Sequence, residues 1–220
     1  MNFFVTGTGT DVGKTYVAAC LCSLLKSRGS TAYFKPAMSG NSRDGQGQLI
    51  PGDAQYVISS AGLSQSLSSA CPFVYEAALS PHLAAELEGR AFDLSLVLEA
   101  YGQLQKEYEH LVIEGAGGVL CPFSRDVMTL DVMKAFDAPL VVVADAGLGV
   151  LNALGLTAFW LKNQPLKVAG FVLNRYCPQD PMHQDNLKML EAHLPFPLLG
   201  VVEEQSAFQP TPYFEEVLSS

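Results

Sequence analysis

Short apolar runs alternate along this chain with longer stretches in which apolar residues recur at helical spacing. The short runs predict strands at 2–6, 31–35, 110–114, 139–145, 167–174 and 197–202. The longer stretches predict helices at 14–28, 53–61, 80–88, 93–108, 129–136, 150–163 and 181–193. This alternation is typical of an α/β fold with a mostly parallel central sheet and helices on both faces. With no linker or repeat in view, we expect a single domain over residues 1–220.

Two segments fit this pattern less well. Residues 38–52 are rich in Gly, Ser, Asn and Gln and predict a mobile loop. The tail, residues 203–220, shows no clear period, so we assign it no element.

A glycine-rich segment joins the first expected strand to the first expected helix. It reads Gly7-Thr8-Gly9-Thr10-Asp11-Val12-Gly13-Lys14-Thr15. Glycines let backbone amides turn inward around phosphate oxygens, and the start of the following helix attracts an anion. The lysine of such a loop reaches the β- and γ-phosphates, and its threonine hydroxyl binds Mg²⁺. The segment therefore predicts an ATP-binding phosphate loop of the phosphate-loop NTPase type, lengthened by one residue.

Polar residues follow four of the expected strands, namely Lys35, Glu114, Asp145 and Asn174. In open α/β sheets, ligands bind outside the carboxyl ends of the strands, so these side chains are expected near the phosphate loop. Glu114 ends an apolar strand, where an unpaired carboxylate would be costly unless it met a cation. For Lys35, an ordinary solvated lysine is the alternative at this stage.

Phosphate and metal chemistry needs cations for the phosphates and hard oxygens for the metal. Lys14 and Lys35 supply the positive charge, and Thr15, Asp53 and Glu114 supply three oxygens suited to Mg²⁺. Asp53 has a simpler alternative as the cap of the helix that follows it. We find no clear Ser-His-Asp or Cys-His arrangement that would supply a nucleophile from the protein.

Composition narrows the possible partners. The net charge of −9 argues against a general nucleic-acid binder, and it means that ATP must be captured by local positive groups. No apolar run approaches the ~20 residues needed to span a bilayer, and we see no secretory signal. The five cysteines form no Cys-x-x-Cys pair, which indicates reduced thiols and a cytoplasmic protein.

Several further motifs accompany the phosphate loop. They are Lys35-Pro36-x-x-Ser39-Gly40, Ser80-Pro81-His82, Glu114-Gly115-Ala116-Gly117-Gly118, Leu148-Gly149-x-x-Asn152, Leu173-Asn174 and Pro197-Leu198-Leu199-Gly200. In this combination the chain resembles the dethiobiotin synthetase family, from residue 3 to about residue 200.

The resemblance implies an ATP-dependent ring closure. Carbon dioxide adds to one amine of 7,8-diaminopelargonic acid to form a carbamate, whose oxygen attacks the γ-phosphate of ATP. The second amine then attacks the mixed anhydride, which closes a cyclic urea, dethiobiotin, and releases phosphate beside ADP. This is a step of biotin synthesis.

The resemblance also implies site roles. It assigns catalysis to Lys14, Lys35 and Thr10, and ATP binding to residues 9–15 and Asn174. It assigns substrate binding to Ser39, Gly117, Gly118, Gly149, Val150 and Asn152. It further implies a homodimer, in which the segment Gly149–Asn152 of a neighbouring subunit helps to hold the substrate carboxylate.

Three positions depart from the family pattern. Gly147 stands where relatives often carry Lys or Arg, and Ala153 stands where they commonly carry His. The segment Gly200-Val201-Val202-Glu203 stands where they usually read Gly-x-Ile-Pro. Two other readings therefore stay open. A partition-type regulatory ATPase usually carries an earlier lysine in its loop, and no lysine precedes Lys14 here. The second reading is a regulatory phosphate-loop domain that derives from a synthetase but has lost its substrate. The presence of Lys35, Ser39 and Glu114 argues against this reading, and Gly147 argues mildly for it.

Overall fold

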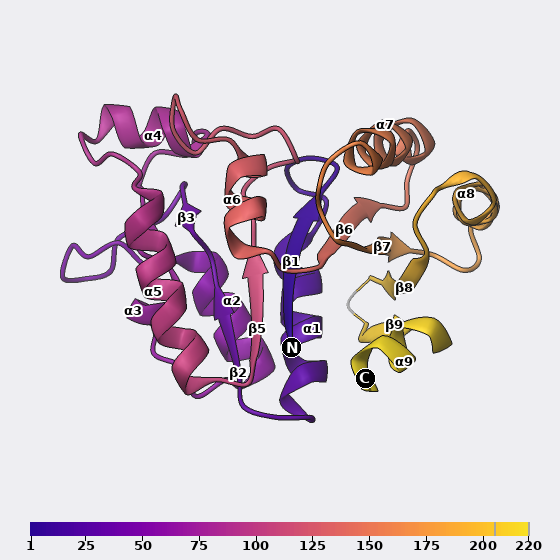
Figure 1. The fold of residues 1–220 in the computed structure, drawn as a ribbon, viewed down its shortest axis with the longest axis horizontal. Helices are drawn as coiled ribbons and strands as arrows, with labels where there is room; N and C mark the ends of the chain where they lie inside the picture. Colours follow the sequence, from indigo (N-terminus) through magenta and orange to yellow (C-terminus); the bar gives the residue numbers. More distant parts are fainter. Residues whose placement is uncertain (205, 220) are drawn as a thin grey trace.

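A computed structural model describes residues 1–204 and 206–219 (Figure 1). The strands are β1 (Asn2–Gly7), β2 (Thr31–Phe34), β3 (Ala37–Met38), β4 (Phe73–Val74), β5 (His110–Glu114), β6 (Leu140–Asp145), β7 (Val168–Tyr176), β8 (Leu198–Glu203) and β9 (Phe208–Pro210). The helices are α1 (Lys14–Lys26), α2 (Gly52–Ala61), α3 (Leu67–Ala70), α4 (Pro81–Leu87), α5 (Leu94–Glu107), α6 (Thr129–Phe136), α7 (Val150–Lys162), α8 (Pro181–His193) and α9 (Pro212–Ser219).

The described residues form one large sheet with the strand order β2-β5-β1-β6-β7-β8-β9. All neighbouring strands in it pair in parallel except β8 and β9, which are antiparallel. The expected strands and helices are all present, with ends that differ by at most two residues. The predicted mostly parallel α/β fold is thus confirmed.

Alternate residues of each strand pack on opposite faces of the sheet, as the two-residue period of a strand requires. Phe3 and Val5 of β1 lie in a core with α1, α2 and α9, whereas Phe4 lies in a core with α5, α6, α7 and α8. Figure 1 shows α5 and α6 in front of the sheet and α1 and α2 behind it. Because helices cover both faces, β1, β5 and β6 are almost continuously apolar and buried.

Strand register brings distant polar residues to one edge of the sheet. Val5 of β1 lies opposite Glu114 of β5, and Phe34 of β2 lies opposite Ile113. Lys35, which follows Phe34, therefore comes beside Glu114. The loop after β1 lies at this same edge, so the fold places the phosphate loop next to both side chains.

Several elements were not predicted. β3 and β4 form a small parallel pair of their own, and the tail contributes β9 and α9 to the fold. The segment expected to be a mobile loop holds an isolated bridge between Arg43 and Leu49, and its mobility stays a prediction. Among the described residues, no helix combines the length and the apolar character needed to cross a membrane.

Candidate functional site

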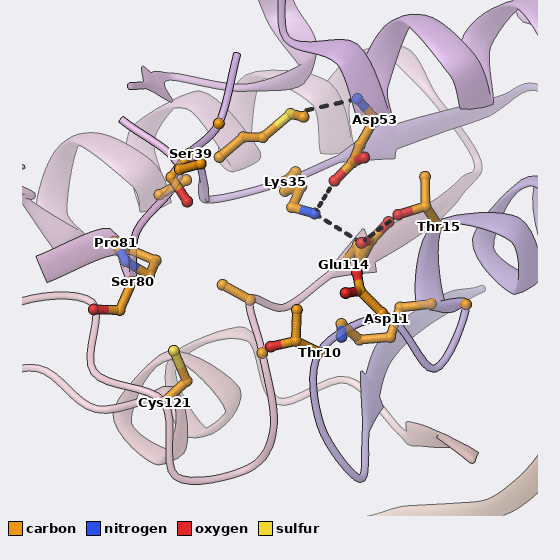
Figure 2. Close-up of a pocket in the computed structure, with 18 of the residues that line it drawn as sticks. Thr10, Asp11, Thr15, Lys35, Ser39, Asp53, Ser80, Pro81, Glu114 and Cys121 are labelled. Carbon is orange, nitrogen blue, oxygen red and sulfur yellow. Dashed lines mark hydrogen bonds and ion pairs between the residues drawn. The ribbon is translucent and has the colours of Figure 1, made fainter. Parts of the chain in front are cut away.

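The main cleft lies at the carboxyl ends of β1, β2 and β5 and has a volume of about 1090 Å³. Figure 2 shows charged and hydroxyl side chains, among them Lys35, Asp53 and Glu114, converging on it. Its lining includes the predicted residues Thr10, Asp11, Gly13, Lys14, Thr15, Lys35, Ser39, Asp53, Glu114 and Gly117. Most of the side chains assigned to phosphate and metal binding are thus together.

The phosphate loop forms a tight turn into α1. Gly13 precedes the helix with a φ of 89°, which favours glycine, and a Cβ atom there would lie 1.9 Å from the side-chain nitrogen of Asn174. The Lys14 ammonium donates a hydrogen bond to the Gly9 carbonyl at 2.7 Å. The lysine therefore lies across its own loop at the start of a helix, where an anion is favoured.

A buried charge cluster lies beside the loop. The Lys35 ammonium donates to Glu114 Oε1 at 2.7 Å and also to Asp53 Oδ2. Thr15 donates to the same Glu114 oxygen at 2.9 Å. The Glu114 side chain is 1% exposed and that of Lys35 is 8% exposed, whereas Asp53 is 32% exposed. Lys35, Asp53, Glu114 and Thr15 are therefore joined by hydrogen bonds.

The two lysines of the cleft differ in electrostatic environment. Burial would lower the pKa of Lys35, but the charges of Glu114 and Asp53, with their hydrogen bonds, raise it above its usual range. The pKa of Lys14 is lowered, chiefly by burial. The negative charge of Glu114 opposes this lowering of the pKa, and the positive charge of Lys35 adds to it. The carboxylates therefore hold Lys35 as a cation.

The donor set fits a small hard cation. Two carboxylate oxygens, from Asp53 and Glu114, already converge on one ammonium group, and the Thr15 hydroxyl lies 2.9 Å from the Glu114 oxygen. Mg²⁺ commonly takes one or two carboxylates together with waters and substrate phosphates. No group of three or more His, Cys, Asp or Glu side chains suited to a metal occurs in the described part of the chain, so a richer metal cage has no support there.

The remaining predicted residues lie at different distances from the cleft. Ser39 lines it and donates to the Leu79 carbonyl at 2.5 Å. A Cβ atom on Gly118 would lie 3.5 Å from the Gly7 carbonyl, so that glycine packs against the phosphate loop. In contrast, Gly149, Val150 and Asn152 begin α7 and do not line this cleft. The structure of one chain therefore does not bring the whole predicted substrate set together.

Asn174 lies behind the phosphate loop. It is 4% exposed, and its amide donates to the Val12 carbonyl at 3.0 Å. This contact joins the end of β7 to the loop. The predicted contact with adenine stays a prediction, but one amide hydrogen already has a partner.

Sequence reasoning missed several residues of the site. Tyr33 is fully buried and donates to Glu114 Oε2 at 2.7 Å. Burial, together with the charge of Glu114, raises the pKa of the Tyr33 hydroxyl well above its usual value. Arg175 lines the cleft and pairs with Asp145 at 2.5 Å. The signal for Tyr33 was its position two residues before Lys35, which places both side chains on the same side of a strand.

Comparison with known proteins gives a family match over most of the chain. A family model described as an AAA domain matches residues 1–211. The chain is 36% identical over 204 residues to the ATP-dependent dethiobiotin synthetase BioD of Brachyspira hyodysenteriae, covering 90% of each protein. It is 38% identical to the protein of the same name from Clostridium kluyveri, covering 90% of this chain and 84% of that protein.

Solved structures share the fold at low identity. The cell division protein FtsY of Thermotoga maritima has a TM-score of 0.55 at 16% identity, covering all of this chain and 68% of that one. The septum site-determining protein MinD of Pyrococcus horikoshii, complexed with Mg-ADP, has a TM-score of 0.50 at 16% identity. The match covers 93% of this chain and 82% of that one. These likenesses support the phosphate-loop fold alone.

Proposed function

The chain belongs to the ATP-dependent dethiobiotin synthetase family. We propose that it carboxylates 7,8-diaminopelargonic acid and closes the product to a cyclic urea at the expense of ATP. A carbamate forms from one amine and carbon dioxide, and its oxygen displaces ADP from the γ-phosphate. The second amine then attacks the carbamate carbon, a cyclic urea closes, and phosphate leaves. Formation of this urea from the diamine, bicarbonate, Mg²⁺ and ATP is the test.

One observation carries the proposal: Lys14, Lys35 and Glu114 line a single cleft, with Lys14 across the phosphate loop and Lys35 paired to Glu114. Transfer of a phosphoryl group depends chiefly on positioning and on neutralising charge. Lys14 can meet the β- and γ-phosphates, and Lys35 can meet the carbamate as the two anions approach. Thr10 lines the same cleft and offers a hydroxyl there.

We assign Mg²⁺ to Thr15, Asp53 and Glu114: the Asp53 and Glu114 carboxylates both contact Lys35, and the Thr15 hydroxyl contacts Glu114. When bound, the ion neutralises phosphate charge. The chain's own part is to hold the three oxygens toward the cleft, with Glu114 paired to Lys35. Ser39 and the backbone around Gly117 and Gly118 are left to position the diamine.

The family match favours the synthetase over the partition-type regulatory ATPase that the sequence left open. The cleft also supports an enzyme rather than a regulator that has lost its substrate. Lys35, Ser39 and Glu114 all line it. We place the enzyme in the cytoplasm, because its five cysteines are free thiols.

Asn174 is proposed to read adenine with the part of its amide that does not contact Val12. Asn174→Asp replaces the donor to the Val12 carbonyl with an oxygen and removes the donor to the base, so ATP affinity should fall by about 1–3 kcal/mol. Calorimetry with ATP and with inosine triphosphate separates the two effects. A loss for ATP alone indicates base recognition, an equal loss for both indicates loop distortion, and unchanged ATP affinity places adenine elsewhere.

We propose a homodimer in which the partner's α7 supplies the carboxylate site. Gly149, Val150 and Asn152 lie outside the cleft lining of their own chain. Around them, Leu148 is 93% exposed and Phe159 is 71% exposed, and exposed apolar residues gathered in this way mark interaction surfaces. Sedimentation as a monomer would argue against this arrangement.

Gly147 leaves this carboxylate site without the basic side chain that relatives often have there. Its φ is not positive, unlike the 94° of Gly149, so a side chain meets no backbone penalty, although its Cβ would lie 3.1 Å from Asp145 Oδ1. Gly147→Lys should lower the KM for the diamine, more so at low salt, because the added attraction is screened.

The matched control is Gly102→Lys on α5, where an added Cβ atom meets nothing within 4 Å. Its KM should stay at the wild-type value at every salt concentration. A folded Gly147→Lys enzyme whose KM also stays unchanged at low ionic strength would show that the carboxylate does not approach this loop.

A further inference from the structure

A tyrosine outside the cleft contacts the carboxylate assigned to the metal. Tyr33 lies on β2, is completely buried, and packs in the apolar core on the α1 side of the sheet. Its hydroxyl nevertheless donates to Glu114 Oε2 at 2.7 Å. An ordinary core position on this strand would take phenylalanine, as at Phe34. The polar atom therefore needs an explanation.

The three side chains that donate to Glu114 divide between its two oxygens. Thr15 and Lys35 both contact Oε1 and both line the cleft. Tyr33 alone contacts Oε2, from the buried side. A carboxylate held at one oxygen from behind presents the other oxygen, with fixed orientation, to the front.

We propose that Tyr33 is the positioning residue of the Mg²⁺ site: its hydroxyl fixes Glu114 so that Oε1 faces the cation. This inference rests on the assignment of Glu114 as a metal ligand in the proposed function. Groups that hold a metal ligand from behind set its orientation, and their loss typically costs 10- to 100-fold in metal affinity or activity. Tyr33 does not touch the substrates, so it is not a catalytic residue.

The register explains how one strand supplies both contacts. Tyr33 lies opposite Val112, and Lys35 directly follows the last residue of β2, which lies opposite Ile113, the residue before Glu114. Side chains two residues apart on a strand point to the same side. Lys35 can therefore donate to the Glu114 carboxylate from the cleft, and Tyr33 can donate to the same carboxylate from the core.

The test measures ADP affinity by calorimetry, with Mg²⁺ and again with EDTA, and needs neither the diamine nor turnover. For Tyr33→Phe, the gain in ADP affinity that Mg²⁺ provides should fall by roughly 10- to 100-fold, with the affinity in EDTA unchanged. The matched control is Tyr101→Phe, which removes a buried hydroxyl that accepts from Asn2 at 3.0 Å, far along β1 from the phosphate loop. Its Mg²⁺-dependent gain should equal that of the wild type.

A double-mutant cycle with Glu114→Gln covers the case in which Tyr33→Phe folds poorly, because the double variant has no charged carboxylate whose Oε2 has lost its donor. The cycle is expected to show no further loss of Mg²⁺ dependence when Tyr33→Phe is added to Glu114→Gln. Additive losses, or a folded Tyr33→Phe protein with the wild-type gain, would overturn the role of Tyr33 alone. If the ADP affinity of the wild-type protein is the same with Mg²⁺ and with EDTA, the metal assignment is overturned as well.

Discussion

Alanine at Lys14 or Lys35 is expected to lower turnover by roughly a hundred- to a thousand-fold, the size of effect seen when one preorganised charge contact to a transition state is removed. Both ammonium groups lie in the cleft, and neither has a replacement among the described lysines that line it. The measurement is kcat for ADP release with the diamine and bicarbonate saturating. Lys26→Ala is the matched control, because Lys26 ends the same helix and likewise donates to backbone carbonyls, of Ala61 and Gly62.

The two variants should differ in stability. Lys14 donates to a carbonyl, whereas Lys35 holds Glu114 and Asp53 together, so Lys35→Ala leaves two carboxylates without their cation. Removing one member of a buried ion pair costs about 3–5 kcal/mol. Mg²⁺ should therefore raise the melting temperature of Lys35→Ala more than that of the wild type. Near-wild-type turnover of a folded Lys35→Ala enzyme would remove Lys35 from the reaction.

Glu114→Gln is expected to raise the Mg²⁺ concentration needed for half-maximal activity by at least about 10- to 100-fold, which is the usual cost of disturbing even the outer partners of a metal ligand. Thr15, Tyr33 and Lys35 all donate hydrogen bonds to this carboxylate. The glutamine side chain would place its own NH₂ group, which is also a donor, against at least one of them. Mg²⁺ titrations of activity and of ADP affinity measure the effect.

Glu109→Gln provides the matched control for that titration. Glu109 stands just before β5, at the opposite end of the same strand, and accepts from the Ser30 amide at 2.9 Å. Its replacement should leave the Mg²⁺ titration as in the wild type. If Glu114→Gln folds and shows the same titration as well, Glu114 is not a metal ligand.

The large elements of this fold could be predicted because each has a clear period or an unbroken apolar run. β6 is buried along nearly its whole length and contains three consecutive valines, so it could be recognised without the structure. β3 and β4 have two residues each and show no period, and β9 ends in Pro210. Their positions depend on contacts between distant segments, which a local pattern does not contain.

The cleft was predictable to the extent that parallel strands end at a common edge. That rule brought Lys35 and Glu114 together and placed them near Lys14. It could not assign Tyr33, because a tyrosine in a strand reads as an ordinary β residue. It also could not show that Arg175 pairs with Asp145, since that contact depends on the backbone of Arg175, with a φ of 54°.

The central claim is that this cleft joins one carbon from carbon dioxide to two amines of 7,8-diaminopelargonic acid at the expense of ATP. The most direct measurement incubates the purified protein with the diamine, isotopically labelled bicarbonate, Mg²⁺ and ATP, and identifies the products by mass spectrometry. The account predicts a cyclic urea that carries the label, formed in equal amounts with ADP and phosphate. Release of ADP that ignores the diamine and yields no labelled urea would contradict it.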